Sequence, residues 1–243
     1  MASAAHYQAV LQKVDPLAPA VKALHFALSG CERFDFVPGQ FVTLIVPFAE
    51  LGDQEPGKRS YSLASFADGQ PRVELAVTRV DTGVVSRWLH GLSVGARVQA
   101  VGPYGLFTLD RPPDADLCFV ATGTGIAPFR PMLRRVFEIG TRRRVTLVFG
   151  CRHEEDILYR AEFEALERAH ENFRFIPTLS RGAADWTGGR GHVQEHVERD
   201  FIAPRLTDTE FYICGLKKMV DDVRQRLKRQ GWDRKKLHQE RYD

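Results

Sequence analysis

The pattern of apolar and polar positions changes near the middle of the chain. Up to about Leu109 the apolar residues form short runs separated by glycine turns, which favours strands. A helix is expected only over residues 85–92, where strand alternation is absent. Several short strands with turns between them predict a small barrel or sandwich. The predicted strands are 41–46, 73–78 and 94–101.

Beyond a stiff polar connector at residues 111–114, apolar strand runs alternate with amphipathic helices. This β–α alternation implies a parallel sheet that is covered on both faces. We therefore predict two domains, residues 1–110 and 111–243. The strands of the second domain are predicted at 117–121, 145–149 and 211–214, and the helices that follow them at about 128–138, 161–169 and 217–229.

Composition and charge exclude several classes of protein. Hydrophobic residues make up 44% of the 243 residues and charged residues 27%, a mixture typical of folded globular proteins rather than disordered chains. The net charge of +3 is uneven, because residues 1–110 carry 9 basic and 10 acidic side chains and the remainder carry 25 and 21. A nucleic-acid binder is usually more basic. The basic excess is compatible with solvated helix faces, an acidic protein partner or a phosphorylated ligand.

Cysteine spacing and the lack of long apolar runs narrow the choice further. Zinc and iron–sulfur sites need clustered thiolates, whereas the four cysteines stand singly at 31, 118, 151 and 214. We expect no metal site. No run reaches the length of a membrane helix, and the first residues lack the basic region of an export signal, so we expect a cytoplasmic protein without membrane binding.

A glycine turn in the second half is typical of a phosphate site. Residues 121–128 read Ala-Thr-Gly-Thr-Gly-Ile-Ala-Pro, follow an apolar strand and open a helix. Gly123 and Gly125 allow close approach of a ligand, and Thr122 and Thr124 offer hydroxyl groups. Pro128 stands where the dinucleotide fingerprint has its third glycine. Gly150, Ser180 and Gly215 follow other strand runs and are expected at the same sheet edge.

Ser180 and Arg181 follow the apolar run 173–179, with Arg190 and Gln194 shortly downstream. A hydroxyl and two guanidinium groups suit a phosphate monoester. Beside a dinucleotide turn, the 2′-phosphate of NADPH is the expected ligand.

The first half carries a second candidate phosphate site. Arg59, Ser60, Tyr61 and Ser62 combine a guanidinium, a planar ring and hydroxyls next to predicted strands, and residues 83–86 (Gly-Val-Val-Ser) lead from a turn into a helix. Two phosphate-binding turns in two domains indicate an enzyme that passes something between two cofactors.

Taken together, these motifs resemble those of the ferredoxin–NADP⁺ reductase family, closest to its plant-type branch. The resemblance extends from about residue 37 to the C-terminus. The segment 149–159 is also similar to the related diflavin reductases. The motifs that carry the resemblance are 59–65, 83–86, 102–105, 121–130 and 214–219.

The resemblance implies an antiparallel β-barrel that holds FAD, followed by an α/β parallel-sheet domain that binds NADP(H). The residues that match flavin contacts are Arg59, Ser60, Tyr61, Ser62, Leu75, Ala76, Val77, Thr78, Gly83, Val84, Val85 and Ser86. Those that match NADP contacts are Thr122, Gly123, Thr124, Gly125, Arg152, Ser180, Arg181, Arg190, Gln194, Cys214 and Gly215.

Four residues match positions that act in the reaction. The resemblance implies that Ser62 lies near flavin N5, the atom that accepts hydride, and that Cys214 lies beside the nicotinamide. Glu240 and Tyr242 match the plant-type ending, in which an aromatic ring stacks on the flavin and a glutamate supports proton and electron exchange. A disordered tail is the alternative for residues 240–243.

The sequence departs from the family pattern in three places. Asp243 follows Tyr242, whereas plant-type chains end on the aromatic residue. His192 occupies the position of a tyrosine that stacks on adenine. The first 35 residues carry no family motif, so the residue that packs on the FAD adenine is not identified.

The resemblance implies electron transfer between NADPH and a one-electron carrier, ferredoxin or flavodoxin, by hydride exchange at FAD N5. Because the cysteines do not cluster, the electrons must leave on a separate carrier, and an acidic one would suit the basic second half. The alternatives are a reductase that supplies an oxygenase or free flavin, and a regulatory subunit that binds flavin and nucleotide without turnover.

Overall fold

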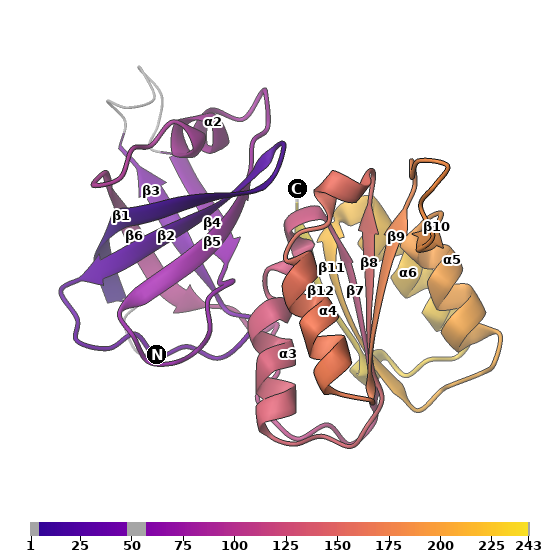
Figure 1. Ribbon diagram of the computed structural model, residues 1–243. Coiled ribbons are helices and arrows are strands. Elements are labelled where there is room, and N and C mark those ends of the chain that lie inside the picture. Colours follow the sequence, from indigo (N-terminus) through magenta and orange to yellow (C-terminus); the bar gives the residue numbers. More distant parts are fainter. Residues whose placement is uncertain (1–4, 48–56, 243) are drawn as a thin grey trace. The chain divides into compact units, whose positions relative to one another are not determined.

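The computed structural model describes residues 5–47 and 57–242, shown in Figure 1. The chain divides into two compact units. The first contains the described residues up to Asp110 together with Ala127–Arg135, and the second contains Arg111–Ile126 and Val136–Asp243. Asp243 itself lies outside the described residues.

The first unit is a curled antiparallel sheet. Its strands are β1 (Ala5–Ala18), β2 (Val21–Ser29), β3 (Phe41–Val46), β4 (Gly57–Ser62), β5 (Arg72–Thr78) and β6 (Arg97–Tyr104), in the order β4-β3-β6-β1-β2-β5. Buried and half-buried residues alternate along β3 because successive side chains point to opposite faces of the sheet. A bridge between Leu63 and Leu75 and a hydrogen bond from Ala64 N–H to the Glu74 carbonyl (2.9 Å) bring the two edge strands together.

Helix α2 (Val84–His90) packs its apolar face on the core of this sheet. Val85 and Leu89 are buried among the core side chains, and the helix contacts both β4 and β5. The three elements that carry the predicted flavin residues therefore meet at one side of the first unit.

The first turns of α3 (Phe129–Glu138) also belong to the first unit. Arg130 Nη1 donates hydrogen bonds to Glu74 Oε2 (2.6 Å) and to the Ala64 carbonyl (3.0 Å). The guanidinium groups of Arg130 and Arg134 lie 4.7 and 4.1 Å from the centre of the Phe66 ring. These contacts fix the start of the helix to the segment that follows β4.

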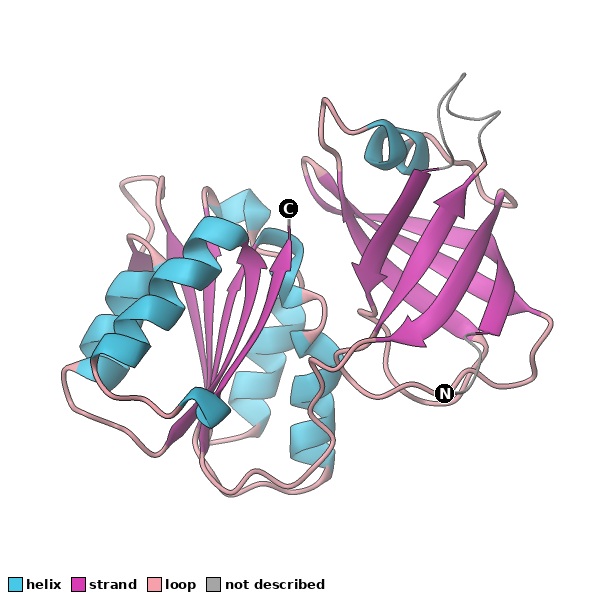
Figure 2. Ribbon diagram, turned by 180° about the vertical axis from the view of Figure 1, so that it is seen from behind, coloured by secondary structure: helices cyan, strands magenta, loops and turns pink. Residues whose placement is uncertain are grey.

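The second unit is a parallel sheet in the order β10-β9-β8-β7-β11-β12. Helix α4 contacts β9, while α5 contacts β8 and α6 contacts β11 and β12 (Figures 1 and 2). The chain adds β8, β9 and β10 on one side of β7 and then β11 and β12 on the other side. Because the connections between parallel strands are right-handed, this change of direction places α5 and α6 on the face opposite α4. The elements are β7 (Asp116–Thr122), β8 (Val145–Cys151), α4 (Arg160–Ala169), β9 (Phe173–Leu179), β10 (Gly189–Arg190), α5 (Val193–Val197), β11 (Thr209–Leu216), α6 (Lys217–Arg229) and β12 (Leu237–Tyr242), with short 3₁₀ or π helices at Gly123–Ile126, Glu154–Asp156, Glu198–Ile202 and Arg234–Lys236.

Strand β9 pairs with the two-residue β10 only at Thr178 and Leu179, so most of its outer edge has no neighbouring strand. The N–H groups of Phe173 and Phe175 are bonded instead by the His170 carbonyl (2.9 Å) and the Glu167 carboxylate (3.0 Å). Pro177 has no N–H to offer. These two hydrogen bonds and the proline protect the edge of β9 against pairing with another chain.

The fold class predicted from sequence is confirmed, because an antiparallel barrel-like sheet precedes a parallel α/β sheet. Sequence patterns did not identify β1, β2, β4, β10, β12 or α5, and the predicted strand 94–101 begins only at Arg97. Residues 240–242 lie in β12, which contradicts the alternative of a disordered tail for these residues. In residues 5–47 and 57–242, no helix is long and apolar enough to cross a membrane, and no three metal-ligating side chains cluster.

Candidate active site

Strand β4 presents Arg59 and Tyr61 on one face, opposite Leu44 and Val42 of β3. Tyr61 packs partly against the core, and burial raises the pKa of its hydroxyl to about 12. The Arg59 guanidinium is exposed and donates to the neighbouring Lys58 carbonyl (2.8 Å). A ring fixed by packing beside an exposed guanidinium suits a ligand with a planar ring and a phosphate.

The two serines of this strand lie on its other face. Ser60 Oγ is 3.0 Å from Thr43 Oγ1, and Ser62 is buried at the end of the strand. On β5, Leu75 and Val77 are fully buried and their side chains belong to the core, while Ala76 lies on the opposite face and Thr78 is half-buried. Any ligand contact at Leu75 and Val77 is therefore made by the backbone.

The amino end of α2 has no side-chain cap and no acidic residue in its first turn. The Ser86 hydroxyl accepts from Val80 N–H (3.1 Å) and lies 3.1 Å from the Gly83 carbonyl, so it holds the turn together. The N–H groups of Val84, Val85 and Ser86 have no acceptor inside the helix, because the first turn leaves them unpaired. They form a donor set that fits a phosphate group.

These features of the first unit fit FAD. The uncapped helix end supplies donors for the pyrophosphate, Arg59 adds a positive charge, and Tyr61 offers a ring for stacking. FAD, when bound, accepts hydride at its ring.

In the second unit, the predicted phosphate turn leaves β7 as a 3₁₀ helix, Gly123–Ile126. Gly123 has φ +54°, a conformation that glycine adopts without strain. A Cβ at Gly125 would lie 2.4 Å from the Cys214 carbonyl oxygen, and one at Gly215 would lie 2.4 Å from Thr122 Oγ1. The turn and the end of β11 therefore meet backbone to backbone.

The ends of β8 and β9 lie side by side at the same edge. Ser180 N–H donates to the Cys151 carbonyl (3.0 Å) and Arg181 N–H to the Arg152 carbonyl (2.9 Å). The side chains of Arg152, Ser180 and Arg181 are exposed. The Ser180 hydroxyl donates to the Cys151 carbonyl (3.4 Å), and the two guanidinium groups are exposed to an anionic ligand.

The Arg190 side chain is bonded to the loop that precedes it. Its guanidinium donates to the carbonyls of Gly182 (3.3 Å), Ala183 (2.8 Å), Ala184 (3.1 Å) and Trp186 (2.8 Å). Arg190 therefore holds the loop that follows Arg181 in place.

Gln194 carries an unpaired acceptor. Its Oε1 is buried and, among the described residues, has no hydrogen-bond partner. The neighbouring Val193 packs closely on Gly150, since a Cβ added at Gly150 would lie 2.8 Å from Val193 Cγ1. Because an unpaired buried acceptor is unfavourable, a ligand donor such as an amino group or a hydroxyl fits this position. His192 is exposed at the amino end of α5, where its N–H donates to Glu195 (3.3 Å).

The parallel pairing of β11 and β12 sets Cys214 opposite Glu240 and Leu216 opposite Tyr242. Cys214 is fully buried. Burial, and then the Glu240 carboxylate, raise the pKa of its thiol well above the usual value, against the lowering effect of hydrogen bonds from Tyr242 and the Gly215 N–H. The raised pKa keeps the thiol protonated, so it is not activated as a nucleophile.

The predicted residues thus form two groups, one in each unit. Within the second unit the structure brings together the Thr122–Gly125 turn, Cys214–Gly215 and the Glu240–Tyr242 pair, and it places Ser180, Arg181 and Gln194 along the same sheet edge. The partners of Arg190 are backbone carbonyls in residues 182–186, and backbone acceptors leave no signal in the sequence.

The chain matches two protein-family models. The oxidoreductase FAD-binding domain matches residues 8–109, and the oxidoreductase NAD-binding domain matches residues 119–225.

Individual relatives agree with these matches. The chain is 45% identical over 251 aligned positions to ferredoxin–NADP reductase B of Sorangium cellulosum, covering 100% of both proteins. It is 33% identical to the reductase component DmpP of phenol 2-monooxygenase from Pseudomonas, but spans only 59% of that protein. Among solved structures, the cytochrome P450 reductase GcoB of Amycolatopsis superimposes with a TM-score of 0.87 at 30% identity, over 98% of this chain and 70% of that one. With an FAD-binding and an NAD-binding domain, this chain belongs to the ferredoxin–NADP reductase family of oxidoreductases.

Proposed function

We propose that the chain transfers electrons between NADPH and a one-electron protein carrier through bound FAD. The observation that carries this proposal is the meeting of Cys214, Glu240 and Tyr242 with the phosphate turn at the carboxyl edge of the second unit. A nicotinamide cofactor anchored at that turn would have a small neutral thiol, a carboxylate and an aromatic ring beside it.

Each of these groups has a distinct part in the proposal. The neutral Cys214 thiol orients the nicotinamide by contact, and Tyr242 covers the ring-binding position until the nicotinamide displaces it. Glu240 holds or passes a proton at its carboxylate. In the first unit, Ser62 is the proposed hydrogen-bonding group near N5 of FAD. We propose further that the boundary between the flavin and nucleotide domains lies near residue 111.

Selectivity for NADPH over NADH would depend on Ser180 and Arg181, which are exposed at the sheet edge. Arg190 acts on them indirectly by holding the loop 182–186. Arg181→Ala is expected to raise the KM for NADPH by one to two orders of magnitude, each tenfold corresponding to ~1.4 kcal/mol. Arg168→Ala on the exposed surface of α4 is the matched control.

The test is a steady-state assay with purified ferredoxin and flavodoxin, run with NADPH and with NADH. Fast carrier reduction that depends on NADPH and weakens with salt is expected, because an acidic carrier would meet the basic excess of residues 111–243. An unchanged KM in Arg181→Ala, or equal use of NADH by the parent enzyme, contradicts the 2′-phosphate assignment. Indifference to both carriers contradicts the proposed partners.

A second candidate function has a specific observation in its favour. The chain is also 33% identical to reductase components of oxygenase systems, although it spans less than two thirds of their length. Delivery of electrons to an oxygenase component is therefore the alternative. If this alternative holds, the chain reduces an added oxygenase protein with NADPH or NADH when ferredoxin and flavodoxin are left out of the assay.

A further inference from the structure

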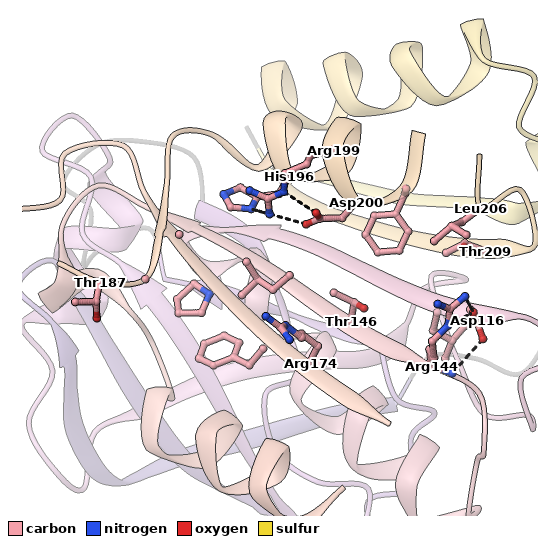
Figure 3. A pocket seen from close by; sticks show the side chains of 17 residues that line it. Asp116, Arg144, Thr146, Arg174, Thr187, His196, Arg199, Asp200, Leu206 and Thr209 are labelled. Atoms are coloured by element: carbon pink, nitrogen blue, oxygen red, sulfur yellow. Dashed lines mark hydrogen bonds and ion pairs between the residues drawn. The ribbon is translucent and has the colours of Figure 1, made fainter. Parts of the chain in front are cut away.

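A pocket of about 480 Å³ lies in the second unit, between the α5 side of the parallel sheet and the segment that leads into β11 (Figure 3). Its floor is formed by side chains of β8 and β9, and its upper wall by residues from α5 and the π helix Glu198–Ile202. Apart from the loop ending at Gly189, the pocket includes none of the residues proposed for NADPH or the redox centre. Its size is typical of small-molecule sites.

The floor of the pocket carries polar side chains next to an apolar row of the same sheet face. Strand pairing aligns Phe211, Cys118, Thr146 and Arg174 in one row across β11, β7, β8 and β9. The first two are fully buried, whereas Thr146 is half-buried and Arg174 exposed. The neighbouring row consists of apolar side chains, Ile213, Val120, Val148 and Ile176. A hydroxyl and a guanidinium thus stand side by side in the pocket, as Figure 3 shows.

The charges in the pocket leave one guanidinium uncompensated. Arg144 pairs with Asp116 (2.7 Å) and Arg199 pairs with Asp200 (2.6 Å). Within residues 5–47 and 57–242, the side chains of Arg174 and Thr146 make no hydrogen bond or ion pair. The pocket therefore carries one net positive charge with its donors unused, which suits a single anionic group.

The buried His196 has no capacity left for a ligand. Arg199 Nη2 lies 2.9 Å from His196 Nδ1, and since a guanidinium only donates, Nδ1 must be the acceptor. The proton is then on Nε2, which donates to Thr178 Oγ1 at 2.9 Å. Thr178 Oγ1 in turn donates to the Gly191 carbonyl (3.0 Å). His196 shapes the wall, and recognition is left to Arg174 and Thr146.

Apolar side chains complete the lining. Phe201 and Leu206 form one wall, and Ile176 and Pro177 continue the floor; Ile176 and Leu206 remain partly exposed. We propose that this pocket binds a small carboxylic acid with an apolar or aromatic body. Its carboxylate pairs with Arg174 in bidentate fashion and accepts from Thr146, and its body covers Ile176, Phe201 and Leu206.

Titration calorimetry on the flavin-loaded enzyme with 3-phenylpropionate tests the proposal. We expect saturable binding with a Kd of about 1 mM or below, as for a small ligand held by one charged pair and a modest apolar contact. Arg174→Gln is expected to weaken binding about tenfold or more, and Thr146→Val severalfold. Arg168→Gln removes the same charge from the exposed surface of α4 and should leave the Kd unchanged.

The neutral amide of the probe and saturating NADP⁺ complete the design. The amide should bind at least tenfold more weakly, and NADP⁺ should not displace the acid. The proposal is overturned if the acid does not bind at about 10 mM, tenfold above the expected Kd. It is also overturned if Arg174→Gln and Arg168→Gln bind the acid with equal affinity. Displacement of the acid by NADP⁺ would place it at the nucleotide edge and overturn the proposal as well. Because binding is measured without turnover, its outcome is independent of the proposed electron transfer.

Discussion

Glu210 on β11 is predicted to be a main electrostatic support of the second unit. Its carboxylate accepts two hydrogen bonds from Arg111 Nη2 (2.8 and 2.9 Å), one from His238 Nε2 (2.6 Å) and one from Tyr212 (3.3 Å). The side chain is only 6% exposed. Glu210→Gln keeps the shape and removes the charge that these donors surround.

The magnitude follows from burial. Removing one partner of a buried ion pair leaves the other charge uncompensated and costs ~3–5 kcal/mol. Arg111 is 49% exposed and can regain water, so the lower end of this range, about 3 kcal/mol, is expected. The matched control is Asp110→Asn, which breaks the Arg135–Asp110 pair. Both of those side chains are more than 40% exposed, so a loss of ~0–1 kcal/mol is expected.

The pH dependence gives a second measure of the same network. Burial alone raises the pKa of Glu210, but the hydrogen bond from His238 and the charge of Arg111 outweigh it and lower the pKa below its usual value. The network therefore stabilises the folded state above the ordinary carboxyl pKa. This contribution is lost as the pH falls through the lower, folded-state pKa.

The assay is urea unfolding of the flavin-loaded protein at several pH values, followed by circular dichroism and by tryptophan fluorescence. Trp232 reports locally, since its Nε1–H donates to the Thr209 carbonyl beside Glu210 (3.1 Å). The free-energy difference between parent and Glu210→Gln should shrink toward low pH. A difference below about 1 kcal/mol at neutral pH, or one that does not change with pH, would refute the argument that the buried charge is stabilising.

Three further outcomes are expected. Gly125→Ala places a methyl group against the Cys214 carbonyl, so unfolding should become easier by ~1–3 kcal/mol and kcat should fall more than in a Gly91→Ala control, where φ is −87° and a Cβ makes only ordinary contacts of 3.5 Å or more. Glu167→Ala frees the Phe175 N–H on the edge of β9, and light scattering should detect increased self-association at high protein concentration. Arg190→Gln should raise the KM for NADPH and accelerate hydrogen exchange in residues 182–186 without ligand; unchanged exchange would contradict its role in holding the loop.

Local patterns determined most of the architecture. The apolar run 145–149 and the amphipathic stretch 217–229 correspond to β8 and α6, because side-chain periodicity depends only on the local backbone. The glycine turn at 122–125 was also evident, since its conformational demands are met by few residue types. By contrast, the long bulged strand β1 was not predicted, because its side chains follow no clean alternation and one of its two pairing partners, β6, is distant in sequence.

Tertiary structure alone decided which partners the polar side chains take. Arg190 belongs to a phosphate-binding motif by sequence, but four loop carbonyls occupy its guanidinium. The pairing of Cys214 with Glu240 depends on strand order and register. The same is true of the row in which Thr146 is half-buried and Arg174 exposed while the other members are buried. A sequence determines the local periodicity of its elements, whereas the contacts of a long polar side chain depend on which distant backbone groups the fold brings within reach.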